Sequence, residues 1–521
     1  MESPELRIFG TRFINHFCAA SYSEIFFLFL GFCWILSSLA PTSPRISKTR
    51  VHGFRSFFEP SILLKQRFIT DAHNIISSGC EKFKNEPFVI RRYDADITIL
   101  PMKYLDELRL VSVDVLSSKK AAVANFMPKW TNMGVMATSD LHIRVLNNRL
   151  NPNLPKYLSL AKSELDEFWT TEVPQCEDWT VVDIQDVARR LVSRMSASIF
   201  LGYPACRNEE WLDLSVQFSI DMFTTAFTLR AFPPWMHFLI APLIPARWRT
   251  LRYLQTGRRI IGALMKDRAA NSEKTMKEDE TLLGWMVNHG TKSEVAVAEM
   301  SDRQCLLTLA SIHTTSNSVT NLLFNLCEYP EWIPILREEI ESVAKEQDGT
   351  NVTREWLSKL MKLDSFIVET LRLRHPIMLS PQRLVVQPIT LKDGTYIPAG
   401  TRVAWAAFHH AKDPANITNP EVFDPMRSFR KRQESPELAN RYSATQINSD
   451  NLAFGYGSQA CAGRHFAVGE TKMMMARLLT EFDIKFVDGQ SRPKSIHAGE
   501  MVFLDPDAKI MLKKRATRSK F

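Results

Sequence analysis

The sequence predicts a mainly α-helical fold with small β-sheets, an α+β protein behind one N-terminal transmembrane helix. Three observations carry this prediction. Residues 302–326 and 464–482 are long runs without proline, and the first also lacks glycine, as expected of helices. Short apolar runs at 88–90 and 97–99 have the length of strands. Residues 25–40 are apolar and uncharged.

The apolar segment divides the chain into four parts. We expect a polar N-terminal segment at 1–24, a transmembrane anchor at 25–40, a Pro-containing basic hinge at 41–60 and one large domain at 61–521. The anchor is slightly shorter than the roughly 17–25 residues that span a bilayer. A cleaved signal peptide is the alternative, but the late apolar core and Pro41 disfavour it. The flanking basic residues place the large domain on the cytoplasmic side: Arg45, Lys48, Arg50 and Arg55.

Charge and cysteine usage exclude several classes of protein. The formal net charge is +8, which suits an anionic membrane or an acidic protein partner. No recognised motif supports binding to nucleic acid. The eight cysteines are scattered without a CxxC pair, so the sequence indicates neither a zinc site nor a disulfide framework. Reduced thiols facing the cytosol are the simplest interpretation.

Hydrophobic periodicity predicts the remaining elements of the large domain. Residues 112–134 have no clear period, and we expect a long loop there. Residues 384–397 should form a hairpin that turns at Asp393-Gly394. Helices are expected at 61–82, 102–110, 141–150, 183–201 and 365–374.

The most informative stretch is 454–464, which reads Phe-Gly-Tyr-Gly-Ser-Gln-Ala-Cys-Ala-Gly-Arg. Its glycines allow tight turns and a close approach of the backbone to a flat ligand. Cys461 lies just ahead of a helix N-terminus, where backbone N–H groups favour the thiolate. A thiolate so placed is a suitable axial ligand for haem iron. A buried structural cysteine is the alternative interpretation.

The spacing Phe454-x-x-Gly457-x-x-x-Cys461-x-Gly463 resembles the haem-binding loop of the cytochrome P-450 family of haem-thiolate monooxygenases. The resemblance implies the cytochrome P-450 fold for the large domain. It also implies haem b, an iron protoporphyrin IX, as a cofactor ligated by the Cys461 thiolate. One position departs from the family pattern, because Gln459 stands where a basic residue usually contacts a haem propionate.

By the same resemblance, the basic helix at 141–150 points a basic side chain at a haem propionate. His142, Arg144 and Arg149 are the candidates, and a solvated basic face is the alternative for each. Arg383 lies where the family places another propionate-binding arginine. Arginine suits that role because its guanidinium pairs with a carboxylate through two hydrogen bonds.

The helix expected at 302–326 carries Ala-Ser-Ile-His-Thr-Thr at 310–315. In the resembled family this helix crosses over the haem, and a threonine at the position of Thr314 helps deliver protons during oxygen activation. Ser311 replaces the family's glycine, and His313 replaces its acid. A histidine near its pKa can relay protons as a carboxylate does, so Thr314 and His313 are the expected catalytic residues. The alternative for both is a structural role within the helix.

A charged triad is expected behind the haem. Glu369 and Arg372 lie three residues apart, so they share one face of a helix. A second arginine, Arg427, ends the sequence Phe-x-Pro-x-Arg. In the resembled family these three side chains form a buried charge network, which implies that Arg427 helps to hold the loop of Cys461.

Two apolar regions are expected to meet hydrophobic partners. Residues 232–240 are aromatic and apolar, and the resemblance implies a loop that dips into the bilayer, with buried core as the alternative. A second set is expected to line a substrate pocket, although each member could equally be core: Phe223, Phe227, Leu306, Ala310, Ile377, Met378, Val502 and Phe503.

The resemblance implies a membrane-bound monooxygenase that uses O2 to hydroxylate or otherwise oxidise a bulky hydrophobic substrate. Its motifs are similar to those of fungal members in secondary metabolism, which points to a terpenoid or polyketide-derived skeleton. Electrons would come from NADPH through a flavoprotein reductase, and the enzyme would sit in the endoplasmic reticulum membrane with its domain facing the cytoplasm. Basic residues could form the docking surface for that reductase: Arg430, Lys431, Arg432, Arg464 and Lys472.

Two other functions stay open at this point. A haem-thiolate isomerase or dehydratase would share the fold and need no reductase. A non-enzymatic haem-binding or membrane protein would share only the ligand. The intact Thr314 and the basic residues near Cys461 favour the monooxygenase.

Overall fold

The computed structural model describes residues 29, 31–32, 44–270, 281–346 and 354–516. The expected N-terminal segment 1–24 lies outside the described residues, as do almost all of the expected anchor at 25–40 and the first residues of the hinge. Among the helices that the described residues form, none is both long enough and apolar enough to cross a membrane.

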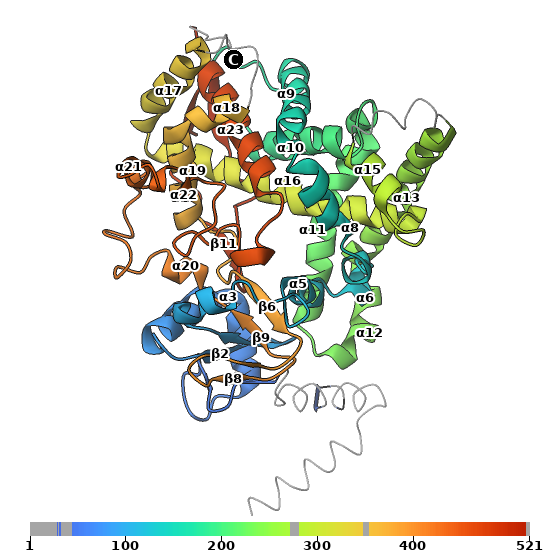
Figure 1. The fold of residues 1–521 in the computed structure, drawn as a ribbon, viewed down its shortest axis with the longest axis vertical. Coiled ribbons are helices and arrows are strands. Elements are labelled where there is room, and N and C mark those ends of the chain that lie inside the picture. The colour runs from blue at the N-terminus through green and yellow to red at the C-terminus, as the bar shows by residue number, and fades with distance from the viewer. Residues whose placement is uncertain (1–28, 30, 33–43, 271–280, 347–353, 517–521) are drawn as a thin grey trace, which may run out of the picture.

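The molecule has a helical part and a part built around a six-stranded sheet, which lie at opposite ends in Figure 1. The longest helix, α16 (Val297–Glu328), runs through the helical part and packs against α10, α11 and α13. It contains no proline or glycine, and apolar side chains recur along its buried face. The helix expected at 302–326 is therefore confirmed, although it begins five residues earlier and ends two residues later. The core helices around it are α9 (Leu154–Thr171), α10 (Ile184–Phe200), α11 (Glu209–Arg230), α13 (Pro245–Ala270), α19 (Met361–Leu373) and α23 (Arg464–Glu481).

Shorter helices complete the described chain. On the side of the sheet these are α3 (Ser61–Lys82), η1 (Met102–Tyr104), α4 (Leu105–Leu108) and α20 (Ala407–His410). In the helical part they are α7 (Val135–Thr138), α8 (Leu141–Val145), the π-helix η2 (Leu146–Leu150), η3 (Ala205–Arg207), η5 (Ala241–Leu243), α15 (Leu282–His289), α17 (Trp332–Glu346), α18 (Arg354–Lys359), α21 (Arg427–Gln433), α22 (Leu438–Arg441) and η6 (Gly457–Gln459).

The main sheet has the strand order β1-β2-β3-β9-β6-β4. Its strands β2 (Phe88–Arg91) and β3 (Asp96–Ile99) pair antiparallel, and both are buried along their length, which confirms the two strands expected from the sequence. The other members are β1 (Arg50–Val51), β4 (Leu116–Ser117), β6 (Gln382–Val385) and β9 (Arg402–Ala404). Two small sheets contain β5 (Thr180–Val182), β10 (Phe482–Phe486) and β13 (Ile510–Lys514), and β11 (Ile496–Ala498) with β12 (Met501–Phe503).

The hairpin expected at 384–397 forms only in its second half. Strands β7 (Ile389–Thr390) and β8 (Tyr396–Ile397) pair antiparallel, and Gly394 adopts φ 83° between them. Glycine tolerates this left-handed conformation without strain. Residues 384–385 instead belong to β6, because they pair with β4 and β9 in the main sheet.

The long loop expected at 112–134 is wrong. Residues in that range form strand β4, helix α5 (Ser118–Phe126) and the single turn α6 (Pro128–Thr131). Ser117 caps α5 by accepting a hydrogen bond from the Lys120 amide at 3.1 Å. Met127 separates the two helices in a left-handed conformation, with φ 51°. Helices this short do not develop a readable 3.6-residue period, so the sequence pattern concealed them.

The apolar stretch at 232–240 forms the short helices η4 (Pro234–Met236) and α12 (His237–Ile240). Neighbouring residues form a small apolar cluster that includes Leu229 and Ile244. Phe238 and Leu243 nevertheless remain 61% and 75% exposed. Buried core therefore does not account for the whole stretch, and its outer side presents large apolar side chains to the surroundings.

Candidate active site

Cys461 lies at the end of a loop whose backbone is fixed on both sides. Its amide donates to the carbonyl of Phe454 at 2.8 Å, which closes the loop. The side chain is exposed, yet enough protein surrounds it that burial raises the pKa of the thiol. The Gly463 and Arg464 amides hydrogen-bond the sulfur, and the Arg464 charge acts in the same direction, so all three oppose that rise. These donors act in the direction that the position ahead of α23 predicted, but burial outweighs them and the net shift of the thiol pKa is upward.

The glycine-rich part of the loop is packed against α4. Gly457 adopts φ 74°, and a Cβ at this position would lie 2.0 Å from the carbonyl oxygen of Arg109. The next amide, that of Ser458, donates to the same carbonyl at 3.0 Å. Only glycine fits so close to backbone atoms in this conformation. The Gly457 position is thus needed for the loop to dock at all.

Gln459 joins the Cys461 loop to β4 and α5, in the range where the sequence predicts a long loop. Its side-chain oxygen accepts a hydrogen bond from the Ser118 amide at 2.7 Å. Its side-chain nitrogen donates to the carbonyl of Leu116, also at 2.7 Å. Both ends of the amide are thus used by the junction of β4 and α5. Asn151 makes a similar tie from the other side, because its side chain donates to the carbonyl of Ala462 at 3.1 Å.

Near the centre of α16, Thr314 and its neighbour His313 have different surroundings. Ala310 and Thr314 lie one turn apart and are exposed on a helix that is otherwise largely buried. The Thr314 hydroxyl donates to the Ala310 carbonyl at 2.8 Å. The ring of His313 instead donates through Nε2 to the carbonyl of Val216 in α11, at 3.0 Å. Burial lowers the pKa of His313, so the ring is neutral in this position.

Glu369, Arg372 and Arg427 come together as the sequence predicted. The Arg372 guanidinium donates from Nη2 and Nε to the two oxygens of Glu369, at 2.7 and 2.8 Å. Both side chains are nearly fully buried, at 2% and 7% exposed. The Nε of Arg427 lies 3.5 Å from Glu369 Oε2. The Asp424 amide donates to the same carboxylate at 2.9 Å, so the network also holds the backbone that precedes α21.

Comparison with known proteins agrees with this geometry. Residues 109–513 match the family described as Cytochrome P450. The chain belongs to the cytochrome P450 family. It is 42% identical to "Cytochrome P450 monooxygenase ATR4" of Stachybotrys chlorohalonatus over 97% of both chains. It is 37% identical to "Cytochrome P450 monooxygenase sdnB" of Sordaria araneosa over 94% of this chain and 92% of the relative. It is 38% identical to "Ent-kaurene oxidase" of Fusarium fujikuroi over 90% of this chain and 89% of the relative.

Family membership fixes the class of chemistry. A cytochrome P450 is a haem-thiolate enzyme, so haem b is the cofactor and this chain is a monooxygenase, an oxidoreductase that uses O2. The family implies a redox partner and hydrophobic substrates. The predicted mainly α fold with small sheets is confirmed.

The four basic residues expected near the haem propionates of this cytochrome P450 have different surroundings. Arg144 pairs with Asp140 and Glu294, and Arg149 donates to the Tyr157 hydroxyl. His142 is buried, which lowers its pKa to about 4, and its Nδ1 has no hydrogen-bond partner in the described part of the chain.

Arg383 is buried and bonds only to backbone carbonyls among the described residues. Its guanidinium donates to the carbonyls of Gln382 and Tyr456, at 2.8 and 3.1 Å. Among the described residues, no carboxylate pairs with it, and burial lowers its pKa to about 10. Buried Arg383 and His142, together with the open sulfur of Cys461, fit a haem that brings its own carboxylates.

Two members of the basic surface expected near Cys461 are not on the surface of this cytochrome P450. Lys472 is buried and pairs with Asp364 at 2.6 Å, and Arg432 is buried and pairs with the same carboxylate at 3.1 Å. Their role in docking a partner was predicted wrongly, because a buried aspartate on a neighbouring helix recruits both charges. Arg430 and Lys431 are accessible.

Some of the residues expected to line a substrate pocket lie together in the structure. Phe223 stacks on Phe227 with ring centroids 6.0 Å apart, and Phe227 meets Phe503 edge-on at 6.1 Å. Phe503 and Val502 line one cavity together with Thr314. Aromatic pairs of this kind provide a rigid apolar surface. The sequence predicts these residues as pocket lining only through the family resemblance, because α11 and β12 are far apart along the chain.

Proposed function

We propose that this cytochrome P450 oxidises a bulky terpenoid or polyketide-derived hydrocarbon skeleton in fungal secondary metabolism, with electrons that a flavoprotein reductase delivers from NADPH. The observation that carries the proposal is the aromatic wall of Phe223, Phe227 and Phe503, which reaches the cavity that Thr314 lines. Such a wall binds apolar skeletons by burying their surface. Three relatives named ent-kaurene oxidase support the terpenoid class, because ent-kaurene is a terpenoid hydrocarbon.

Each site residue has a proposed role that follows from its contacts. Cys461 ligates the haem iron, and the bound haem supplies the activation of O2. Arg383 and His142 bind the haem propionates, because both are buried without a carboxylate partner in the described chain. Arg144 and Arg149 are less suited, since each already has a partner in the protein. Phe454, Gly457 and Gly463 shape the loop around the sulfur.

Thr314 is the proposed proton donor. Its hydroxyl proton is engaged by the Ala310 carbonyl, while its oxygen faces the open side of α16 and can accept a hydrogen bond there. When the hydroxyl rotates away from the Ala310 carbonyl, it can donate its own proton towards the open side of α16, while its oxygen accepts a replacement proton. His313 could join such a relay only after leaving the Val216 carbonyl, which makes Thr314 the better supported of the two.

Replacing Thr314 with alanine should separate electron use from product formation. NADPH consumption should continue, while the fraction of electrons that appears in product falls by roughly a hundredfold, the low end of a general acid–base contribution. Product yield per NADPH consumed, measured with purified reductase, tests this. Thr224→Ala is the matched control, because Thr224 makes the same bond to the carbonyl four residues earlier on the outer side of α11. Equal coupling in all three proteins would remove Thr314 from proton delivery.

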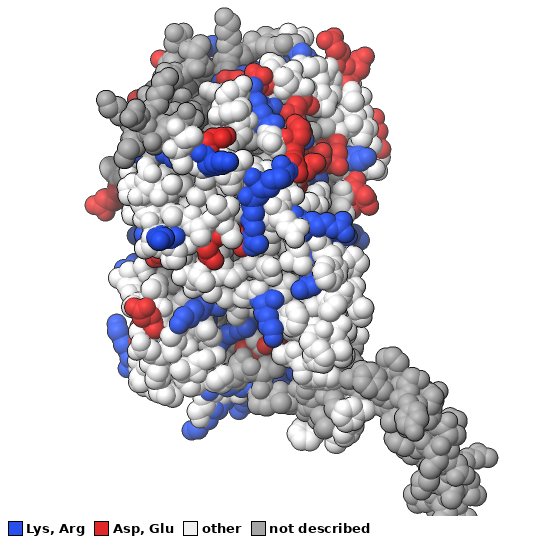
Figure 2. Space-filling view, turned by 90° about the vertical axis from the view of Figure 1, so that its right-hand side faces the viewer, with Lys and Arg blue, Asp and Glu red and all other residues white. Residues whose placement is uncertain are grey.

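The reductase and the membrane are proposed to meet different parts of the surface. Arg430 and Lys431 near the Cys461 side can contact an acidic partner. Phe238 and Leu243 can enter a bilayer, in keeping with an anchor at 25–40 in the endoplasmic reticulum membrane. Figure 2 shows a face on which acidic and basic side chains are interspersed, so a single-sign field does not cover that side of the molecule.

The proposed cytoplasmic placement makes a prediction about glycosylation. Asn416-Ile417-Thr418 is an acceptor sequence, and Asn416 is exposed in the structure. If the domain faces the cytoplasm, Asn416 should carry no glycan when the protein is expressed in yeast. Mobility before and after endoglycosidase treatment measures this. A shift that the Asn416→Gln variant abolishes would place the domain in the lumen and contradict the proposal.

The substrate proposal is tested by product mass spectrometry. The purified enzyme, its reductase and NADPH are supplied with a panel of terpenoid and polyketide precursors, and a product heavier by one oxygen is expected from at least one of them. The alternative is a haem-thiolate isomerase or dehydratase. A rearranged or dehydrated product that forms at the same rate without NADPH and reductase would favour that alternative.

A further inference from the structure

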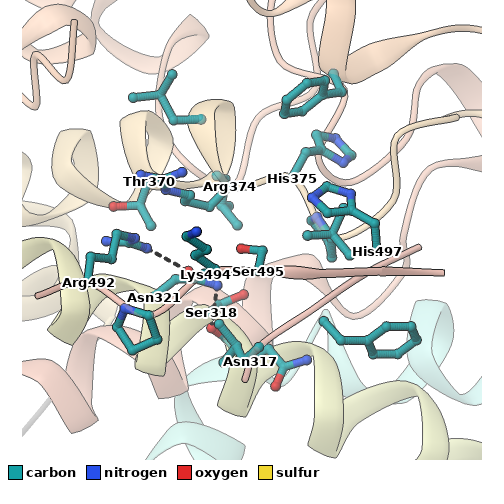
Figure 3. Close-up of a pocket in the computed structure, with 18 of the residues that line it drawn as sticks. Asn317, Ser318, Asn321, Thr370, Arg374, His375, Arg492, Lys494, Ser495 and His497 are labelled. Atoms are coloured by element: carbon teal, nitrogen blue, oxygen red, sulfur yellow. Dashed lines mark hydrogen bonds between the residues drawn. The ribbon is translucent and has the colours of Figure 1, made fainter. Parts of the chain in front are cut away.

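A polar cavity of about 470 Å³ lies between the C-terminal half of α16, the end of α19 and the segment from 492 to 504 (Figure 3). One end of it is lined by Thr314, the proposed proton donor. Its volume is in the range of small-molecule sites in proteins. The cavity therefore extends from the proposed catalytic region to the end of α19 and the segment that follows Arg492.

The lining of this cavity is positively charged. It includes four cationic side chains and no Asp or Glu among the residues that the structure describes: Arg374, Lys412, Arg492 and Lys494. Two of these pair with carboxylates that do not line the cavity: Lys412 pairs with Glu421 at 2.9 Å, and Arg492 pairs with Glu328 at 3.1 Å. Within the described chain, Arg374 and Lys494 pair with no carboxylate. In Figure 3, Arg374, Arg492 and Lys494 gather on one side of the cavity.

Arg374 shows the clearest lack of a partner. Its Nε atom is buried and makes no hydrogen bond to any described residue. A buried donor without an acceptor costs free energy, which a ligand with acceptor oxygens would recover. Arg492 lies close enough for the charge of Arg374 to lower its pKa, after the larger effect of burial, to about 10. Two arginines that face each other in this way favour an anion between them.

The rest of the described lining has an apolar part and a polar part without carboxylates, and the polar part consists of His73, Asn317, Ser318, Asn321, Thr370, His375, Ser495 and His497. The apolar part includes Val502, Phe503 and Leu504 from β12 and the residue after it, and Leu371 and Pro376 at the end of α19 and just beyond it. A small inorganic anion would satisfy the arginines but leave this surface without contacts. An organic molecule with one anionic end would use both halves of the cavity.

We propose that the cavity binds an amphipathic carboxylic acid, with its carboxylate on Arg374, Arg492 and Lys494 and its apolar body directed towards Thr314. The carboxylate oxygens would accept from the guanidinium groups, as planar arginine donors suit. The inference deepens the proposed function. Only the oxidation of the bound acid rests on that function. Binding itself is independent of turnover.

The test compares an acid with its ester on the full-length, haem-loaded enzyme. The probes are the diterpenoid acid abietate and methyl abietate, which share a carbon skeleton, and binding is measured by equilibrium dialysis. Abietate should bind about tenfold more tightly than the ester, the scale of one charge-assisted hydrogen bond. Arg374→Gln and Arg492→Gln should each remove most of this preference. Lys494→Gln should reduce it several-fold without risk to folding, because Lys494 is exposed.

Controls separate the possible outcomes. Arg259→Gln, an exposed arginine of α13 outside the cavity, should leave the preference unchanged. Equal binding of acid and ester by the parent enzyme, or a preference that survives all three cavity variants, would overturn the proposal. Inorganic phosphate that displaces abietate at equal concentration would also overturn it, in favour of a small-anion site. The carbon monoxide spectrum of the same preparation tests the proposed haem-thiolate chemistry separately, so a failure of either proposal is recognisable.

Discussion

Replacing Cys461 with alanine should abolish the red-shifted Soret band of the reduced carbon monoxide complex and leave a protein that retains little haem. The sulfur is the proposed iron ligand, and its surroundings contain the Gly463 and Arg464 donors that stabilise a thiolate. Alanine removes the ligand while it preserves the loop backbone, whose closure depends on the Cys461 amide rather than on the side chain. The measurement is the haem content and the spectrum of the purified variant.

Cys80→Ala is the control for this experiment. Cys80 lies in α3 and is partly buried, so its replacement removes a thiol of this chain without touching the loop. The control should keep both the haem and the shifted band. Cys461→Ser adds a second comparison, because an oxygen replaces the sulfur at nearly the same size. An unchanged spectrum in either Cys461 variant would refute the assignment of the iron ligand.

Removing the Glu369 carboxylate should produce the largest loss of stability. In Glu369→Ala the Arg372 guanidinium keeps its charge, but it loses both bidentate acceptors in a site that is almost fully buried. Breaking a buried pair in this way costs about 3–5 kcal/mol of unfolding free energy. Arg427 and the Asp424 amide lose the same acceptor, so the backbone before α21 should loosen as well. Urea unfolding followed by circular dichroism measures the change.

Glu355→Ala is the matched control for Glu369. Glu355 pairs with Lys359 one helical turn away at 4.0 Å, and its side chain is 72% exposed. Exposed pairs of this type contribute about 0.3–0.5 kcal/mol, so the control should unfold almost as the parent does. If the two variants lose equal stability, the buried triad is not the structural support proposed for it.

The long elements of this cytochrome P450 could be predicted from sequence because they are locally determined. Helix α16 follows from a long run without proline or glycine, and β2 and β3 follow from short apolar runs. Helices α5 and α6 were missed because they are short and are stabilised by tertiary contacts.

Long-range contacts explain the site residues that the sequence could not assign. Nothing at Gln459 indicates that its side chain binds the backbone of residues more than three hundred positions earlier, and the same holds for Asn151 and Ala462. The sequence predicts Lys472 as a surface charge, whereas in the fold Asp364 from another helix pairs with it in the interior. Spacing identifies residues within one element, whereas partners on separate elements need the fold.

The side-chain amide of Gln459 has a mechanical consequence. By bonding the carbonyl of Leu116 and the amide of Ser118 at once, it links the segment that carries the sulfur to the start of α5. A displacement of that helix start would pull on the same backbone that positions Cys461. The linkage therefore couples the position of the Cys461 loop to the position of α5. An electrostatic contact to a propionate at this position would not provide this coupling.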